Sequence, residues 1–316
     1  MSAASLLEDA SGFWIPTPMF ESIKHQIDAL VSCGHTGMLI IGEARLGKSN
    51  AMRALEHALT NRSGQSIRVF YTHYGLRDVG TIRAVFAKTA RALGFDVKRQ
   101  SADTLLDHIV IRLADAAMGN DTRQVALAVD EAQLLTIDQL NAFAEIYNDL
   151  VNLHINCSIL FIANSDQFHS LANALLRPEK RYLRERFFNN VVRFYGIRSE
   201  SELKDCLAGY DDYAVSETPR ICATEYFCPT LYEQSWRLTD IAPIFWQNYR
   251  ERYGIPLGQE SWGMAQFVRT THLLLMDYLP HCDDKDDLLT LEACVIKSLE
   301  GAGIVSSLVT LVGHND

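Results

Sequence analysis

An eight-residue segment that begins at Gly42 constrains this chain more than any other feature. Its sequence, Gly-Glu-Ala-Arg-Leu-Gly-Lys-Ser, fits the phosphate-binding pattern G-x-x-x-x-G-K-S/T at every defined position. Glycines at this spacing let the backbone curl so that successive N–H groups face one concavity and cradle phosphates. We expect Lys48 to reach the β- and γ-phosphates and the Ser49 hydroxyl to ligate Mg²⁺.

The residues on either side of this segment have the patterns of a strand and a helix. Residues 37–41 form a short apolar run suited to a buried parallel strand, and residues 50–59 follow with a helical pattern. Strand, loop and helix in this order are the context that the motif requires, and the helix N-terminus attracts anions. We therefore predict that ATP is bound by Gly42, Glu43, Ala44, Arg45, Leu46, Gly47, Lys48, Ser49 and Asn50.

Two carboxylates close a second apolar run. Residues 125–129 are all apolar, and Asp130 and Glu131 follow them directly. Because open α/β sheets bind ligands at the C-terminal ends of their strands, we expect Asp130 to join Ser49 at Mg²⁺. Glu131 is then the general base that polarises the attacking water. The alternative is a strand that ends in a solvated acidic turn, which the upstream phosphate-binding segment disfavours.

A third apolar run, residues 157–163, ends at Asn164. A polar side chain at that strand tip can orient the attacking water or touch the γ-phosphate, and we assign this role to Asn164. The alternative is an Asn that caps the next helix or forms an Asx turn. Residues 67–72 and 191–197 supply two more strands, so residues 1–198 are expected to form a doubly wound parallel α/β sheet.

The most basic short segment of the chain covers residues 177–188. One arginine here is expected to project into the nucleotide site of a neighbouring subunit, where it stabilises charge that develops on the transferring phosphoryl group. Arg186 is the first choice and Arg184 the second. The alternative is a solvated helix face whose charges form ion pairs with one another.

Charge and pattern both change near residue 199. The net charge is −10, and residues 199–316 hold 8 basic and 19 acidic side chains. This balance argues against a generic nucleic-acid coat but leaves room for a local basic surface on the first domain. Residues 199–230 look acidic and irregular, and helical patterns follow at 235–253, 262–278 and 288–300. We predict a smaller, mainly helical lid domain over residues 199–316.

Composition also suggests a compartment. No apolar run is long enough to span a bilayer, and the N-terminus lacks the basic and apolar regions of a secretory signal. The seven cysteines contain no CxxC pair and are most simply reduced thiols. We therefore expect a cytoplasmic protein without a membrane partner.

The order of phosphate loop, acidic strand, polar strand tip and trailing arginines resembles that of AAA+ ATPases. Within that class, the chain looks like the transposition-regulator ATPases of the TnsC/TniB type, including those of CRISPR-associated transposons. The resemblance is carried by the aromatic-Ile-Pro-Thr-Pro stretch from Phe13 to Pro18 and by the loop from Gly42 to Ser49. The box from Asp130 to Gln133 also fits, although other bacterial AAA ATPases share it.

The resemblance implies an ATPase that acts as a switch. Such regulators assemble with ATP into rings or helical filaments of identical subunits around double-stranded DNA, and hydrolysis helps to disassemble them. They link a target-selector protein of the TniQ type to the transposase. The resemblance places DNA-lining residues after a core strand, and there we favour Arg77, Lys98 and Arg99 for non-specific phosphate contacts. The alternative for each is ordinary surface charge.

A rival function uses the same nucleotide site. A DNA-independent AAA+ signalling or assembly ATPase, associated with secretion or defence, would carry the same phosphate loop and acidic strand. The motifs therefore predict ATP and Mg²⁺ as cofactors in either case, and they do not separate the two outputs.

Overall fold

The computed structural model describes residues 13–75, 80–217 and 219–304 of the 316-residue chain. The chain divides into two compact units. Ser22–Phe194 is called the sheet unit here, and Met1–Glu21 together with Tyr195–Asp316 is called the helical unit.

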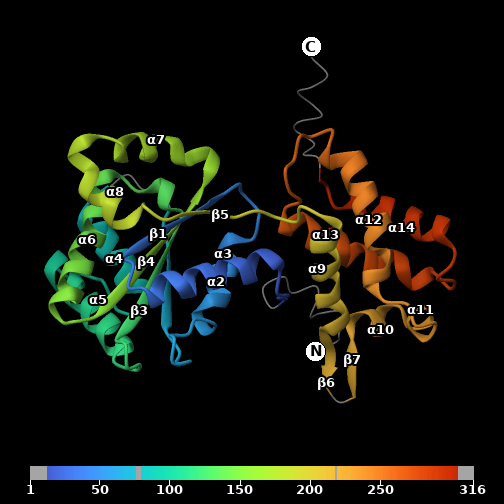
Figure 1. The fold of residues 1–316 in the computed structure, drawn as a ribbon, viewed down its shortest axis with the longest axis horizontal. Coiled ribbons are helices and arrows are strands. Elements are labelled where there is room, and N and C mark those ends of the chain that lie inside the picture. The colour runs from blue at the N-terminus through green and yellow to red at the C-terminus, as the bar shows by residue number, and fades with distance from the viewer. Residues whose placement is uncertain (1–12, 76–79, 218, 305–316) are drawn as a thin grey trace, which may run out of the picture. The chain divides into compact units, whose positions relative to one another are not determined.

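Five parallel strands form the centre of the sheet unit, in the order β2-β3-β4-β1-β5 (Figure 1). Every residue of β3 is buried, as expected for a strand covered on both faces. The strands are β1 (Gly37–Gly42), β2 (Arg68–His73), β3 (Gln124–Asp130), β4 (Asn156–Asn164) and β5 (Val191–Arg193).

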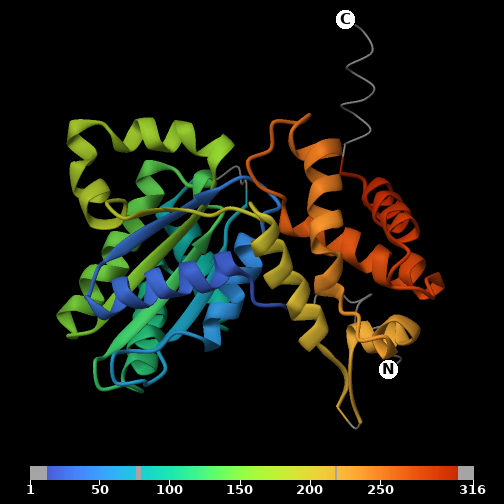
Figure 2. The same cartoon turned by 45° about the vertical axis from the view of Figure 1, so that its right-hand side comes forward.

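Helices cover both faces of this sheet. The crossover from β1 to β2 runs across the sheet in one direction, and every later crossover runs in the other. Because such crossovers are right-handed, α3 lies on one face and the later helices on the opposite face, as Figures 1 and 2 show. The predicted doubly wound parallel sheet is confirmed. Its helices are α2 (Pro18–Ser32), α3 (Lys48–Ala54), α4 (Ile82–Ala92), α5 (Ala102–Ala117), α6 (Ile137–Asn152), α7 (Ser165–Leu175) and α8 (Arg181–Phe187).

The adjacent strands β1 and β4 mark the point where the winding reverses. The helices that follow them, α3 and α7, lie on opposite faces, so their loops part at the C-terminal edge of the sheet. Gly42 is in register with Asn164, and His73 is in register with Asp130. The topology therefore gathers the polar strand ends at one edge.

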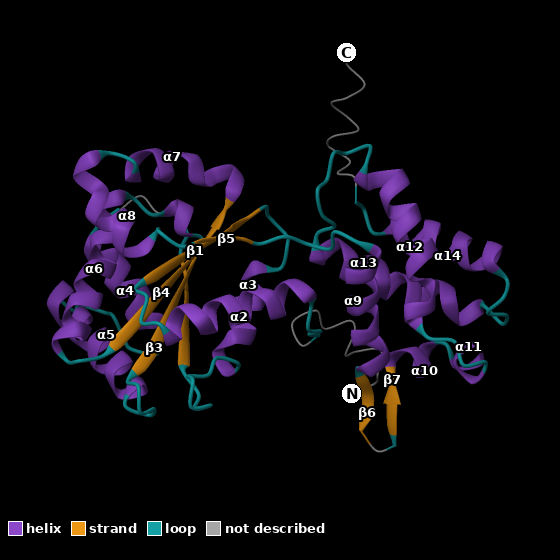
Figure 3. Cartoon of the chain, viewed as in Figure 1, coloured by secondary structure: helices purple, strands orange, loops and turns teal. Residues whose placement is uncertain are grey.

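The helical unit is mainly α-helical, with one two-stranded hairpin (Figure 3). The ring of buried Trp262 stacks on that of Tyr249, with centroids 4.1 Å apart, and Phe245 and Phe267 meet it edge-on. The elements are α9 (Glu200–Asp212), β6 (Ala214–Glu217), β7 (Arg220–Cys222), α10 (Ala223–Phe227), α11 (Pro229–Glu233), α12 (Ala242–Tyr249), α13 (Met264–Leu273) and α14 (Leu288–Gly301).

The interpretation of residues 199–230 as irregular is wrong. This range contains α9, the β6–β7 hairpin and α10. Ser199 caps α9 by accepting a hydrogen bond from the Glu202 backbone N–H, and the buried side chains Leu203, Leu207 and Tyr210 recur at helical spacing. Acidic residues occupy many of the other positions of this helix. The acidic composition of the range therefore drew attention away from the helical spacing of its apolar residues.

Two boundaries differ from those expected. β5 ends at Arg193 instead of continuing to residue 197, because Ile197 exchanges two backbone hydrogen bonds with Trp262 inside the helical unit. The N-terminal segment belongs to the helical unit rather than to the sheet unit. Phe13 packs there against Tyr210, with ring centroids 4.8 Å apart. No helix of the described residues is long and apolar enough to cross a membrane.

Candidate nucleotide-binding site

The two glycines of the phosphate-binding segment, Gly42 and Gly47, are needed for different reasons. Gly47 has φ 96°, a left-handed conformation that glycine adopts without strain. At Gly42, a Cβ atom would lie 2.2 Å from the carbonyl oxygen of Phe194, which follows β5. Gly42 therefore permits close approach of two backbones, a constraint that the loop motif does not reveal.

Lys48 is the first residue of α3 and is only 7% exposed. Its Nζ donates hydrogen bonds to the Gly42 carbonyl at 2.8 Å, to the Glu43 carbonyl, and to Asn164 Oδ1 at 2.9 Å. Burial lowers the pKa of Lys48 from its ordinary value, and the charges of Asp130 and Glu131 oppose that shift. The ammonium is thus held inside the loop beside two carboxylates.

Ser49 and Asp130 meet as the motifs predicted. Ser49 Oγ donates to Asp130 Oδ2 at 2.6 Å, and Asp130 is only 2% exposed. The other carboxylate oxygen, Oδ1, accepts the Glu131 backbone N–H at 2.9 Å. Each oxygen of this carboxylate is therefore engaged by a neighbouring group.

Sequence reasoning missed two residues beside Asp130, both on the neighbouring strand β2. The Tyr71 hydroxyl donates to Asp130 Oδ2, and His73 Nδ1 lies 3.9 Å from the same oxygen. Burial, together with Asp130, raises the pKa of Tyr71, which further favours the protonated phenol that donates this hydrogen bond. Polar residues at the end of a predicted core strand were the available signal.

Glu131 has φ 60°, a left-handed conformation that is uncommon for a residue with a side chain. Its Oε2 accepts hydrogen bonds from Gln133 Nε2 at 2.5 Å and from Asn164 Nδ2 at 3.4 Å. Gln133 also accepts the Asn164 backbone N–H at 3.1 Å, so it ties the ends of β3 and β4 together. The place of Gln133 two residues after Glu131 in the sequence does not by itself predict its hydrogen bond with Asn164.

The alternative reading of Asn164 as a helix cap does not describe its side chain. Asn164 precedes α7, but its side chain makes no capping hydrogen bond to that helix. It accepts from Lys48 and donates to Glu131 instead. One amide therefore connects the loop lysine with the acidic strand end.

Arg184 and Arg186, the two candidates for insertion into the nucleotide site of a neighbouring subunit, form hydrogen bonds within the sheet unit. Arg184 donates to the carbonyls of Leu175 and Leu176 at the end of α7. Arg186 donates to Asn148 Oδ1 at 3.1 Å, and its guanidinium lies 5.3 Å from the ring centroid of Tyr147. Both are half-buried, so neither is fully extended into solvent.

Lys98 and Arg99 are exposed in the loop between α4 and α5. Arg99 has φ 57°, and the Lys98 backbone N–H bonds to Asp96 Oδ1 at 3.1 Å. The Arg83 guanidinium donates to the Gln100 carbonyl, which ties this loop to α4. The third predicted DNA contact, Arg77, lies outside the described residues.

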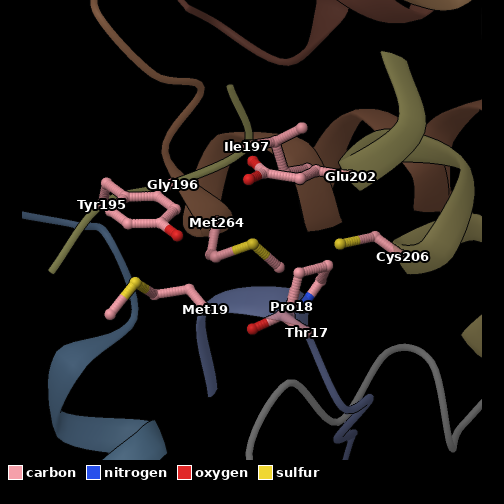
Figure 4. A pocket seen from close by; sticks show the side chains of 9 residues that line it. All are labelled: Thr17, Pro18, Met19, Tyr195, Gly196, Ile197, Glu202, Cys206 and Met264. Atoms are coloured by element: carbon pink, nitrogen blue, oxygen red, sulfur yellow. The ribbon is translucent and has the colours of Figure 1, made fainter. Parts of the chain in front are cut away.

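A separate small hollow lies within the helical unit (Figure 4). Its only acidic lining group, Glu202, already accepts hydrogen bonds from the Arg198 backbone N–H at 2.7 Å and from its guanidinium at 3.1 Å. Its lining therefore offers no unpaired charge to a phosphate. The lining residues are Thr17, Pro18, Met19, Tyr195, Gly196, Ile197, Glu202, Cys206 and Met264.

The groups at the sheet edge fit a nucleotide with Mg²⁺. A loop with an ammonium suits phosphate, and a hydroxyl beside a carboxylate supplies the oxygen ligands that Mg²⁺ prefers. Within the described ranges, no cluster of three or more His, Cys, Asp or Glu side chains could hold a metal ion. One carboxylate is nevertheless enough here, because Mg²⁺ is usually held by one or two carboxylates together with substrate phosphates.

The sequence comparison agrees with this site. Residues 33–171 match the protein-family model described as an AAA domain. That range includes the loop from Gly42 to Ser49, the Asp130–Glu131 pair and Asn164. Residues 33–171 therefore resemble an AAA-type ATPase domain, and the parallel sheet has the AAA+ fold. The helical C-terminal region is consistent with a lid. A comparison with curated proteins finds no match.

Several solved structures are similar to this chain at low identity. Cdc6p from Pyrobaculum aerophilum is 16% identical, with a TM-score of 0.43, covering 86% of this chain and 71% of that one. Drosophila ORC bound to DNA is 14% identical, with a TM-score of 0.47, covering 95% and 69%. PCH-2 from C. elegans is 14% identical, with a TM-score of 0.42, covering 90% and 69%.

Proposed function

We propose that this protein is an ATP-dependent, oligomeric AAA+ regulator of DNA transposition. It assembles on double-stranded DNA and links a target-selector protein of the TniQ type to the transposase. ATP hydrolysis acts as a switch that ends the assembled state. The transposition branch of the proposal rests on the resemblance of the segment from Phe13 to Pro18 and of the phosphate loop to TnsC/TniB-type regulators.

The observation that best supports nucleotide hydrolysis is the joined set of strand ends. Lys48 after β1, Glu131 after β3 and Asn164 at the end of β4 are connected by hydrogen bonds, although they lie far apart in the sequence. Bound Mg²⁺-ATP would supply the phosphoryl group and the cation that neutralises its charge. Lys48 then binds phosphate, Ser49 and Asp130 hold the metal, and Glu131 takes the proton of the attacking water.

One further feature supports assembly on DNA. The exposed Lys98 and Arg99 offer positive charge in one loop, and repetition of that loop in an oligomer would sum weak phosphate contacts.

In the N-terminal segment, Ile15 is buried, and a Cβ added to Gly209 of α9 would lie 3.0 Å from the Cβ of Ile15. The segment that carries the resemblance is thus an integral part of the helical unit.

Electron microscopy of the full chain tests the proposal. The protein is imaged with Mg²⁺ and a slowly hydrolysed ATP analogue, with and without double-stranded DNA. Rings or filaments that require both nucleotide and DNA support the transposition regulator. Nucleotide-dependent assembly that ignores DNA favours the DNA-independent signalling or assembly ATPase instead. Lys48→Ala should abolish assembly, whereas the matched variant Lys297→Ala, at an exposed position of α14, should not.

DNA affinity and its dependence on salt concentration test the proposed DNA surface separately. Lys98→Ala combined with Arg99→Ala should weaken DNA binding about equally for all sequences. It should also reduce the slope of log affinity against log salt concentration by about one unit for each phosphate that is no longer neutralised. Unchanged salt dependence would remove these two residues from the DNA surface.

A further inference from the structure

We propose that Tyr71 is a positioning residue that holds the Asp130 carboxylate in the orientation needed to bind Mg²⁺. The inference rests on the proposed ATPase function and adds a residue that no motif contains. Its basis is the hydrogen bond from the Tyr71 hydroxyl to Asp130 Oδ2, the oxygen that also accepts from Ser49. Tyr71 acts through Asp130 and is not assigned a contact with the nucleotide.

The carboxylate of Asp130 is restrained from three elements. Oδ2 receives Ser49 from α3 and Tyr71 from β2, and Oδ1 receives the backbone N–H that follows β3. A carboxylate oxygen offers two lone pairs, so both positions of Oδ2 are used and one on Oδ1 remains. Removing the Tyr71 hydroxyl would leave Ser49 on Oδ2 and the Glu131 backbone N–H on Oδ1, so the carboxylate would be held less tightly against rotation about its last bond. Mg²⁺ binding would then have to restrict that extra motion.

Tyr71 is itself held by the helix that supplies Ser49. The Arg53 guanidinium carbon lies 5.1 Å from the centroid of the Tyr71 ring. Arg53 follows Ser49 by four residues in α3, so both side chains lie on one face of that helix. The phosphate-loop helix therefore sets the position of Tyr71 as well as that of the metal-binding hydroxyl.

A second tyrosine near the end of the same strand shows what a purely structural phenol looks like. Tyr74 is 6% exposed, and its hydroxyl lies 2.7 Å from Thr89 Oγ1 of α4. Its hydroxyl also lies 3.4 Å from the Val85 carbonyl of α4, and its ring meets that of the core residue Phe143 edge-on. None of the hydrogen bonds of this hydroxyl in the described part of the chain is to a carboxylate. Tyr71 differs because its hydroxyl donates a hydrogen bond to the carboxylate of Asp130, the proposed Mg²⁺ ligand. Tyr74 is therefore the matched control.

The test compares Tyr71→Phe with Tyr74→Phe in the full chain. Tyr71→Phe keeps the ring beside Arg53 and removes only the donor. Binding of a fluorescent ATP analogue is measured in EDTA and across a Mg²⁺ titration. Outer-shell partners of metal ligands typically contribute about 10- to 100-fold to metal affinity. We expect Tyr71→Phe to raise the half-maximal Mg²⁺ concentration by about tenfold or more, with binding in EDTA unchanged. Tyr74→Phe should leave both quantities as in the wild type.

Three other results would overturn the inference. A Tyr71→Phe titration that coincides with the wild-type curve removes Tyr71 from the metal site. Equal weakening in EDTA and in Mg²⁺ assigns Tyr71 to the packing of the phosphate loop instead. A wild-type chain that binds no nucleotide overturns the proposed function and this inference together. The first two results, obtained with a wild-type chain that does respond to Mg²⁺, overturn the inference alone.

Discussion

The edge of the sheet unit and the core of the helical unit are held together by different contacts. At the edge of the sheet unit, Lys48, Asn164 and Glu131 are tied to one another by hydrogen bonds. In the core of the helical unit, aromatic rings pack together, and Trp262 Nε1 is buried without a hydrogen-bond partner in the described structure. A satisfied polar network fixes side-chain positions, whereas apolar packing mainly supplies stability. The sheet edge is thus held mainly by polar contacts and the helical core mainly by packing.

Tryptophan placement offers a simple way to observe the units separately. All four tryptophans, at positions 14, 236, 246 and 262, belong to the helical unit. Tryptophan fluorescence therefore reports unfolding of that unit, while nucleotide binding and hydrolysis report on the sheet edge. Variants in the two units can be compared through these separate signals.

The largest expected effect is on hydrolysis. Glu131→Gln keeps the shape of the side chain but removes the base, so the rate should fall by about 10²- to 10⁴-fold while nucleotide binding persists. Steady-state phosphate release and equilibrium binding measure the two quantities. Glu233→Gln, at an exposed position of the helical unit, is the control. Normal hydrolysis by Glu131→Gln would mean that another residue is the base.

Trp262→Ala should break the packing of the helical unit. Loss of this buried ring is expected to lower the free energy of unfolding by about 3–5 kcal/mol. Urea denaturation followed by the fluorescence of the remaining tryptophans measures the change. Trp262→Phe should cost less, because Nε1–H has no partner to lose and much of the aromatic contact remains. Equal costs for the two variants would show that the ring contacts do not carry the stability of this unit.

Arg186→Ala tests whether hydrolysis at the sheet edge requires an arginine from a neighbouring subunit. If Arg186 acts in trans, the rate should drop by about 10²- to 10³-fold, and only in the assembled state. Mixing this variant with Glu131→Gln should restore some activity, because a neighbour then provides the missing arginine. Arg181→Ala, whose side chain pairs with Glu185 on the same exposed helix surface, is the control. Lack of rescue at every mixing ratio would argue against a trans arginine, and Arg184→Ala would then be tested in the same way.

The smallest effects compare one helix cap from each unit. Thr136 caps α6 in a capping box with Gln139, and Ser199 caps α9. Each change to Ala should cost about 1 kcal/mol. Thr136→Ala should shift the unfolding curve seen by circular dichroism but not the tryptophan curve, and Ser199→Ala should shift both. A common shift of both probes by both variants would show that the two units unfold as one.

Several parts of the site were predictable because they are local in the sequence. The phosphate loop, the acidic pair after an apolar run and Asn164 at a strand tip each depend on residues within a few positions of one another. The structure brings Lys48, Ser49, Asp130, Glu131 and Asn164 together at the expected edge. Tyr71 and Gln133 could not be assigned in this way, because their partners depend on which strands are neighbours and on how the chain turns after β3.

The amino-acid sequence by itself determined the class of fold, since hydrophobic periodicity and loop glycines act over short stretches of chain. It also indicated which strand ends carry the polar side chains of the candidate site. Only the tertiary structure decided that Gly42 must lack a side chain to admit the Phe194 carbonyl, and that Phe13 packs in the helical unit. Only it placed Tyr71 on Asp130. Each of these contacts joins residues distant in the chain, so strand order and packing set them rather than local preference.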